Sequence, residues 1–234
     1  MLRITLFDID GTLMSMGGAA RAAFGQALCE AAGRTVSTDG TAFVGKTDPQ
    51  IARELLTRHG VGGADLEPAI GETIRLYLRY FERDLPRAAG ARLLPGVPAL
   101  LEALGKRPEA RLALLTGNVE AGARLKLDHF GLTGQFDFDL SCFGSDDADR
   151  YRLPELALRR ARTRLGADID GSQLVIIGDS EHDVLCGKSV GARAVAVATG
   201  WTSATTLRSL RPAECLTDFS DTARAVEAIL GNGA

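Results

Sequence analysis

The sequence predicts an α/β fold in which a parallel sheet forms the core and an all-helical segment is inserted after the first strand. From about residue 92 onward, short apolar runs alternate with helical patterns, which is typical of βαβ units. Leu2 to Phe7 is a further short, β-prone apolar run that needs partner strands, so we assign it to the same sheet. Between about residues 15 and 90 only helical patterns are evident.

The individual elements follow from these patterns. The core strands expected after Phe7 are Arg111–Leu115, Phe136–Phe143, Gln173–Ile177, Arg193–Ala198 and Glu214–Leu216. The expected helices are Ala19–Ala32, Ile51–His59, Asp65–Asp84, a short one around Leu100–Leu104, Val119–Phe130, Pro154–Leu165 and Asp183–Val190. We therefore predict a Rossmann-like core made of residues 1–14 and 91–234, with a helical cap at residues 15–90. A helical insert near the catalytic edge of a sheet is well placed to cover it.

The bulk composition excludes several classes of function. The chain has 234 residues, of which 45% are hydrophobic and 24% are charged. Its net charge is -3, so it lacks the excess of basic residues that would indicate binding to nucleic acid. No apolar run approaches the roughly 20 residues that span a bilayer, so no membrane partner is expected. Leu2–Phe7 is too short for a signal-peptide core. We expect a cytoplasmic protein, either a monomer or a homodimer.

Two carboxylates follow the first strand. Asp8 and Asp10 lie at i and i+2, so on an extended chain their side chains project to the same side, and Gly11 permits a sharp turn. Ligands of open α/β sheets bind at this carboxyl edge. Two such carboxylates stay ionised together only if a cation or hydrogen-bond donors neutralise them, and Mg²⁺ is the obvious candidate cation. A carboxylate can also act as a nucleophile. An ordinary Asp-Gly turn is the alternative.

Other strand ends carry matching chemistry. Thr116, Gly117 and Asn118 lead into a helix, whose N-terminal N–H groups suit phosphate oxygens, although Asn118 could simply cap that helix. Asp179 follows another strand and can supply a further metal ligand, with Asp183 one helical turn away. Read alone, this second site could be an acidic loop. Arg150 and Arg152 are the candidate cations for a bound phosphoryl group.

These motifs resemble those of the haloacid dehalogenase superfamily, and more closely its phosphoglycolate phosphatase-like members. Asp8–Thr12 matches the first motif, DxDGT; Leu115–Asn118 is similar to the second; and Gly178–Asp183 matches the fourth, GDSxxD. The third motif departs, because the family usually has a lysine followed by proline. Counting back from Leu165-Gly166 reaches Arg152, with Arg150 as the alternative.

The resemblance implies a role for each residue. Asp8 would attack the substrate phosphorus and carry the phosphoryl group, while Asp10 would protonate the leaving oxygen and then activate water. Asp8, the backbone carbonyl of Asp10, and Asp179 would hold Mg²⁺, and Asp183 would support the metal or orient the basic residue. Thr116 would bind a phosphate oxygen, beside Gly117 and Asn118. Dehalogenation is disfavoured, because dehalogenating members lack an acid at the position of Asp10.

The predicted helical insert contains a further sequence motif. Gly40–Thr47 fits the P-loop pattern GxxxxGK[ST], but the residues before it are polar and strand-poor. We interpret Gly45–Pro49 instead as a cap turn that reaches the active site, as the family resemblance implies. Lys46 would then meet an anionic part of the substrate or remain solvated.

The resulting functional prediction is a Mg²⁺-dependent phosphatase acting on a small phosphorylated metabolite. A phosphomutase of the same family is the first alternative, and a P-loop NTPase or kinase is a less favoured one. A non-catalytic protein on the same fold should have lost Asp8 or Asp10, and this chain has kept both.

Overall fold

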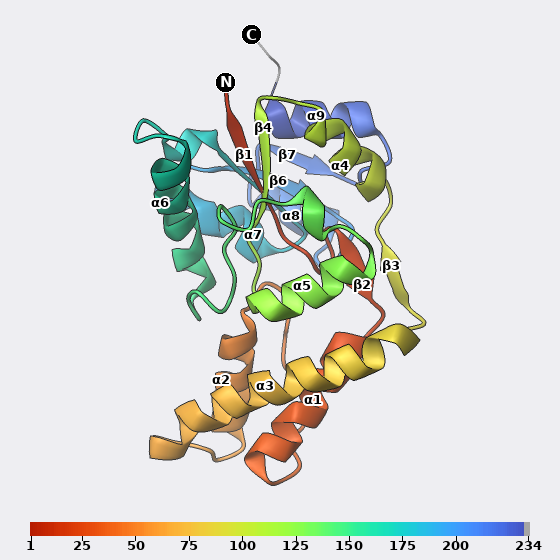
Figure 1. Ribbon diagram of the computed structural model, residues 1–234, viewed down its shortest axis with the longest axis vertical. Helices are drawn as coiled ribbons and strands as arrows, with labels where there is room; N and C mark the ends of the chain where they lie inside the picture. The colour runs from red at the N-terminus through yellow and green to blue at the C-terminus, as the bar shows by residue number, and fades with distance from the viewer. Residues whose placement is uncertain (232–234) are drawn as a thin grey trace.

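A five-stranded parallel sheet forms the centre of the protein, with helices on both faces (Figure 1). The computed structural model describes residues 1–231. The strand order is β4-β1-β5-β6-β7, and every neighbouring pair is parallel. These strands are β1 (Arg3–Phe7), β4 (Ala110–Leu114), β5 (Leu174–Gly178), β6 (Arg193–Val197) and β7 (Glu214–Leu216). The predicted α/β class is confirmed.

The register of the three central strands brings their carboxyl ends to one edge. Phe7, the last residue of β1, lies opposite Leu114 of β4 and Ile177 of β5. The residues that follow these three positions therefore emerge side by side, although the three strands are far apart in the sequence. Asp8, Thr116 and Asp179 all leave the sheet at this edge.

Alternation along the strands divides the core into two faces, as the period of two requires. Ile4 and Leu6 of β1 pack in the cluster that contains residues of α6, while Phe7 packs in the larger cluster with residues of α4 and α9. Figure 1 shows α6 on one side of the sheet and α4 and α9 on the other. The core helices are α4 (Val97–Gly105), α5 (Glu120–His129), α6 (Leu153–Leu165), α7 (Glu181–Cys186), α8 (Ala204–Ser209) and α9 (Thr222–Leu230).

A helical unit projects from the carboxyl edge of the sheet (Figure 1). It contains α1 (Ala19–Ala32), α2 (Asp48–Arg58) and α3 (Leu66–Asp84), which lie within the predicted cap segment. Aromatic contacts join α1 to α3, with the ring centroids of Phe24 and Tyr77 5.2 Å apart. Thr47 caps α2 by accepting the N–H of Gln50, and Pro49 stands in its first turn, both common helix-start features.

A two-stranded antiparallel ribbon joins this unit to the core. Its strands are β2 (Met14–Met16) and β3 (Ala91–Leu93). The sequence analysis found neither strand, because three residues are too few to establish a period of two.

The predicted strand at Phe136–Phe143 was wrong. Only Cys142 in this stretch forms a bridge, to Leu115, and the rest is irregular. Asp137 turns the chain, because its carboxylate accepts the N–H of Asp139 and its carbonyl accepts the hydroxyl of Ser141. The local side-chain bonds compete with a β-ladder despite the apolar residues between them.

Among residues 1–231, no helix combines the length and the apolar character needed to cross a membrane.

The packing of the helical unit can be tested at Leu28, which is fully buried on α1. We expect Leu28→Ala to lower the free energy of unfolding by about 3 kcal/mol, because it leaves a cavity beneath α3. Chemical denaturation followed by circular dichroism measures this change. The control Leu165→Ala, at a half-exposed position of α6, should cost less than about 1 kcal/mol. Equal losses in both variants would contradict the packing described.

Candidate active site

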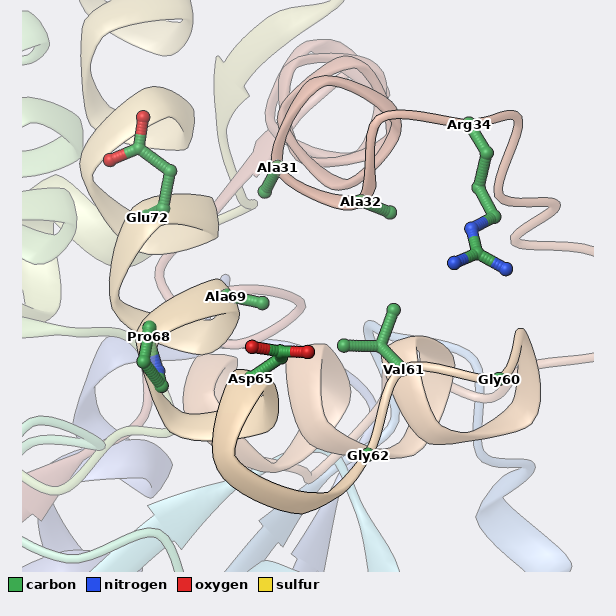
Figure 2. Close-up of a pocket in the computed structure, with 10 residues that line it drawn as sticks. All are labelled: Ala31, Ala32, Arg34, Gly60, Val61, Gly62, Asp65, Pro68, Ala69 and Glu72. Atoms are coloured by element: carbon green, nitrogen blue, oxygen red, sulfur yellow. The ribbon is translucent and has the colours of Figure 1, made fainter.

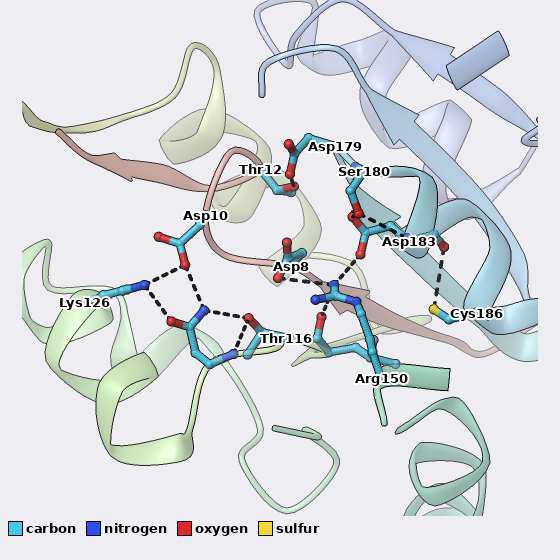
Figure 3. A network of polar contacts seen from close by, with 12 residues as sticks. Asp8, Asp10, Thr12, Thr116, Lys126, Arg150, Asp179, Ser180, Asp183 and Cys186 are labelled. Atoms are coloured by element: carbon cyan, nitrogen blue, oxygen red, sulfur yellow. Dashed lines mark hydrogen bonds and ion pairs between the residues drawn. The ribbon is translucent and has the colours of Figure 1, made fainter. Parts of the chain in front are cut away.

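Three buried carboxylates gather at the carboxyl edge of the sheet. One oxygen from each of Asp8, Asp179 and Asp183 lies within 4.8 Å of the other two (Figure 3). Asp8 follows β1, whereas Asp179 and Asp183 flank the start of α7. Gly11 makes room for Asp179: its φ is +82°, and a Cβ there would lie 2.6 Å from the Asp179 carboxylate. The glycine of the DxDGT motif is thus a packing requirement.

A single arginine enters this cluster. The guanidinium of Arg150 donates to the carboxylate of Asp183, and its Nη2 lies 3.4 Å from Oδ1 of Asp8. The opposite oxygen of Asp183 accepts the N–H and the hydroxyl of Ser180. Both oxygens of Asp183 are therefore engaged, and this residue orients the arginine.

The prediction that Arg152 supplies the motif cation needs correction, because the structure places Arg152 outside the cluster. Its side chain is 72% exposed and pairs loosely with Asp147 and Asp149. Arg150–Arg152 forms a short 3₁₀ helix, in which successive residues point about 120° apart. Only one of the two arginines can face the sheet edge, and that one is Arg150.

Burial and mutual repulsion shift the acids of the cluster. Loss of solvent raises the pKa of Asp8 to about 6; the nearby charge of Arg150 lowers it, and those of Asp183 and Asp10 raise it further. Burial raises the pKa of Asp179 to about 8, again with Asp183 and Asp8 adding repulsion. Burial alone would lower the pKa of Arg150, but Asp183 and Asp8 outweigh it and hold that pKa above its ordinary value.

Asp10 belongs to a separate polar group. The carbonyl of Ile9 accepts the N–H groups of Leu13 and Met14, so the chain turns directly after Ile9. The charge of Asp10 still raises the pKa of Asp8, so the two carboxylates lie near each other, but they have different hydrogen-bond partners. Oδ2 of Asp10 accepts from Asn118 Nδ2 at 2.8 Å and from Lys126 Nζ at 2.6 Å (Figure 3).

The second strand end links the two groups. Thr116 is fully buried after β4, and its hydroxyl oxygen accepts from Nδ2 of Asn118 at 2.8 Å. Asn118 precedes α5 and donates from the same nitrogen to Asp10. Its side chain makes no cap hydrogen bond to the helix, which starts from Val119 instead. The structure thus brings Thr116 and Asn118 to the site, between Asp8 and Asp10.

The loop before α2 reaches down to the same edge. The N–H of Asp48 donates to the carbonyl of Gly117 at 2.8 Å, and Thr47 Oγ1 donates to the carbonyl of Ala148 at 2.6 Å. A Cβ on Gly117 would lie 2.0 Å from the carbonyl oxygen of Lys46, so glycine is required for this close approach. The helical unit is therefore seated on the second strand end.

The side chain of Lys46 points elsewhere. Its ammonium pairs with Glu54 of α2, within the helical unit. Residues 40–47 are irregular apart from short turns, and within the described chain no strand directly precedes them, so the strand–loop–helix of a P-loop is absent there. The P-loop alternative for Gly40–Thr47 is therefore contradicted by the fold.

Known proteins share both the sequence pattern and the fold. A haloacid dehalogenase-like hydrolase family model matches residues 2–191. The chain belongs to the haloacid dehalogenase-like hydrolase family. It is 31% identical over 245 residues to the "Probable phosphatase IndB" of Dickeya dadantii (strain 3937), covering 98% of this chain and 96% of that protein.

Two further comparisons agree with this assignment. A phosphoglycolate phosphatase of Rhodospirillum rubrum is 29% identical over 86% of this chain and 81% of its own length. The crystal structure of a predicted phosphoglycolate phosphatase from Haemophilus somnus 129pt superposes with a TM-score of 0.71 at 21% identity, covering 96% and 98% of the two chains. The predicted family resemblance is confirmed.

The haloacid dehalogenase-like motifs fit a hard divalent cation. Asp8 and Asp179 are buried, mutually repelling carboxylates with raised pKa values, and the adjacent Arg150 is already shared with Asp183. Apart from the 3.2 Å hydrogen bond from Thr12, no protein donor is recorded for the carboxylate of Asp179 within residues 1–231. Carboxylate oxygens are the ligands that Mg²⁺ prefers.

Sequence reasoning missed Lys126. This lysine is buried on α5, where Ala123 and Leu127 are buried as well. A lysine on the apolar face of a helix is a signal that the sequence does contain, because buried lysines are rare unless they are paired. Neither the spacing nor the family motifs pointed to its partner.

The charge imbalance predicts a response to pH and metal. With pKa values raised from 3.8 to about 6 and about 8, Asp8 and Asp179 bind more protons in the folded state than in the unfolded state. The metal-free protein should therefore lose stability as the pH rises from about 4 to about 8. Thermal unfolding should show this loss, and millimolar Mg²⁺ at pH 8 should reverse it.

The matched variants are Asp179→Asn and Asp168→Asn. The first should weaken both responses, because it removes one of the repelling charges and a ligand. The second changes an exposed carboxylate far from the cluster and should behave like the unsubstituted protein. A Mg²⁺ response that survives Asp179→Asn unchanged would contradict the metal assignment.

Proposed function

We propose that this protein is a Mg²⁺-dependent phosphatase that hydrolyses a small phosphorylated metabolite through an aspartyl-phosphate on Asp8. The observation that carries the proposal is the pairing of the buried Asp8 with Arg150 beside Asp179. A carboxylate nucleophile, a fixed cation and a further acid are the groups that phosphoryl transfer to aspartate needs. The phosphatase names of two relatives support the same reaction class.

In the first step, an oxygen of Asp8 forms a bond to phosphorus while the bond from phosphorus to the ester oxygen breaks. Asp10 gives its proton to that leaving oxygen, so the product departs as a neutral alcohol. Arg150 offsets negative charge on the transferring group, and its Nε is a buried donor with no partner in the described chain. Thr116 and the adjacent backbone supply further hydrogen bonds.

In the second step, Asp10 takes a proton from water, and the water oxygen attacks the phosphorus of the aspartyl-phosphate. The acyl phosphate bond breaks, inorganic phosphate leaves, and Asp8 is regenerated. Asp10 lies outside the acidic cluster, which suits its roles as proton donor in the first step and proton acceptor in the second. Its carboxylate is half-exposed and can reach both an ester oxygen and water.

Asp8, Asp179 and the backbone carbonyl of Asp10 would hold the Mg²⁺, with Asp183 supporting the site through Arg150. When bound, the ion supplies positive charge that offsets the carboxylates and the transferring phosphoryl group.

We further propose that residues 15–90 act as the cap that selects the substrate. The Lys46–Asp48 loop lies directly against Gly117, so the helical unit contacts the core beside the reacting group. A small ester such as phosphoglycolate suits this arrangement. The phosphoglycolate phosphatase relative from Rhodospirillum rubrum favours the same substrate class. Because Lys46 pairs with Glu54, a role in substrate binding would require it to exchange that partner.

The nucleophile can be tested by a screen of small phosphate esters with Mg²⁺. Asp8→Asn should abolish phosphate release, a loss of at least about 1,000-fold, because an amide cannot accept the phosphoryl group. Released phosphate measures the activity, and thermal unfolding verifies that the variant is folded. Persistent turnover in a folded Asp8→Asn variant would falsify the assigned nucleophile.

The same assay separates hydrolysis from phosphomutase activity. With a sugar phosphate as substrate, a phosphatase releases inorganic phosphate, whereas a mutase returns an isomeric sugar phosphate. We expect free phosphate and no isomer, and product analysis by NMR distinguishes the two.

The assignment of Arg150 as the cation for the phosphoryl group predicts different outcomes for substitutions at Arg150 and Arg152. Arg150→Lys, which restores the family's usual residue type, should keep part of the activity, whereas Arg150→Met should lower kcat/KM by about 100-fold or more. Arg152→Met should stay close to the unsubstituted enzyme, because that side chain is exposed. Steady-state kinetics measure all three, and a larger loss at Arg152 would reverse the assignment.

A further inference from the structure

Lys126 is buried at the seam between the core and the helical unit. Its side chain is only 3% exposed and belongs to α5. Nζ donates to Oδ2 of Asp10 at 2.6 Å and to Oδ1 of Asn118 at 2.5 Å (Figure 3). The ring of Phe81, from α3, lies 5.9 Å from the ammonium. One lysine thus joins the end of β1, the end of β4 and the helical unit.

A contribution to folding stability does not by itself explain why Lys126 is buried. Burying an ammonium costs several kcal/mol, which a partner recovers only with good geometry. Lys126 is in the last turn of α5, where positive charge is favourable, but an exposed lysine gains that benefit without being buried. A buried lysine with two protein acceptors is more readily explained by what it holds in place.

The contacts of Lys126 show that the group it holds in place is the Asp10 carboxylate. Asp10 lies beyond the end of β1, in the turn that begins at Ile9, and its carboxylate is held by side-chain donors. Lys126 and Asn118 both donate to the same oxygen of Asp10, Oδ2. No protein donor is recorded for Oδ1 of Asp10 among the described residues, so that oxygen is left for the reaction.

We propose that Lys126 is a positioning residue that acts through Asp10, fixing Oδ2 so that Oδ1 faces the ester oxygen and then the water. This inference rests on the proposed function, in which Asp10 transfers the proton. Asn118 completes the arrangement, because it donates to Asp10 and accepts from Lys126. Seating of the helical unit buries Lys126, which strengthens its hydrogen bonds by excluding water from the ammonium.

Two other roles fit the geometry less well. Lys126 is not the phosphoryl cation, because Arg150 occupies that position against Asp8. Nor is it arranged as a free anchor for a substrate anion, since two protein acceptors already engage its ammonium. Both alternatives predict effects that do not depend on Asp10, which makes them separable by experiment.

The test compares two esters that differ in their need for an acid. Glycerol 3-phosphate has an alkoxide leaving group that must be protonated, whereas 4-nitrophenyl phosphate has a leaving group that departs without a proton. Lys126→Met should lower kcat/KM for glycerol 3-phosphate by about 100-fold and for 4-nitrophenyl phosphate by less than about 5-fold. The control Arg124→Met, on the exposed side of the same helix, should change neither.

A double variant decides whether the lysine acts through Asp10. In an Asp10→Asn background, adding Lys126→Met should leave kcat/KM for 4-nitrophenyl phosphate and for glycerol 3-phosphate essentially unchanged, because the group it positions is gone. Losses that multiply with those of Asp10→Asn would overturn the proposal, as would equal losses on the two esters in the single variant.

Failure of the proposed function gives a different pattern. If Asp10→Asn itself shows no preference between the esters, or Asp8→Asn keeps its activity, the reaction assignment fails whatever Lys126 does. A crystal structure of Lys126→Met then still decides the positioning claim without any assay. An Asp10 carboxylate that rotates away supports it, and one that stays in place in a folded variant overturns it.

Discussion

The site depends on the balance of charge around Asp8. Three carboxylates and one guanidinium are buried at the end of the central strands, which leaves an excess of negative charge where solvent cannot screen it. Burial raises the pKa values of Asp8 and Asp179, and the excess of negative charge raises them further. A protein can keep such a cluster ionised only with a further cation, and the all-oxygen donors favour a hard one.

The register of the sheet makes this cluster possible. Because β1, β4 and β5 end at the same level, residues from distant parts of the chain meet without long loops. The turn that begins at Ile9 then separates two environments at this edge. Asp8 faces the acids and Arg150, while Asp10 faces Asn118 and Lys126. In the proposed reaction, this division gives attack to Asp8 and proton transfer to Asp10.

Much of this was predictable from local sequence. The strand ends Asp8, Thr116 and Asp179 were identified because a buried strand that stops at a polar residue is a clear pattern, and the parallel sheet that joins them follows from βαβ alternation. The helices of the insert were similarly clear, with the helix predicted at Ala19–Ala32 matching α1. The predictions that failed depend on three-dimensional contacts or on the conformation of very short segments. The choice between Arg150 and Arg152 depends on the phase of a three-residue helix, Phe136–Phe143 is turned by its own aspartates, and the partner of Lys126 lies 116 residues away in the sequence.

The most direct measurement is a crystal structure grown with Mn²⁺, an oxygen-preferring ion whose anomalous signal marks its position. The charge balance described above predicts one strong peak that contacts carboxylate oxygens of both Asp8 and Asp179. A peak elsewhere on the surface, or none at this edge of the sheet at saturating Mn²⁺, would contradict the account.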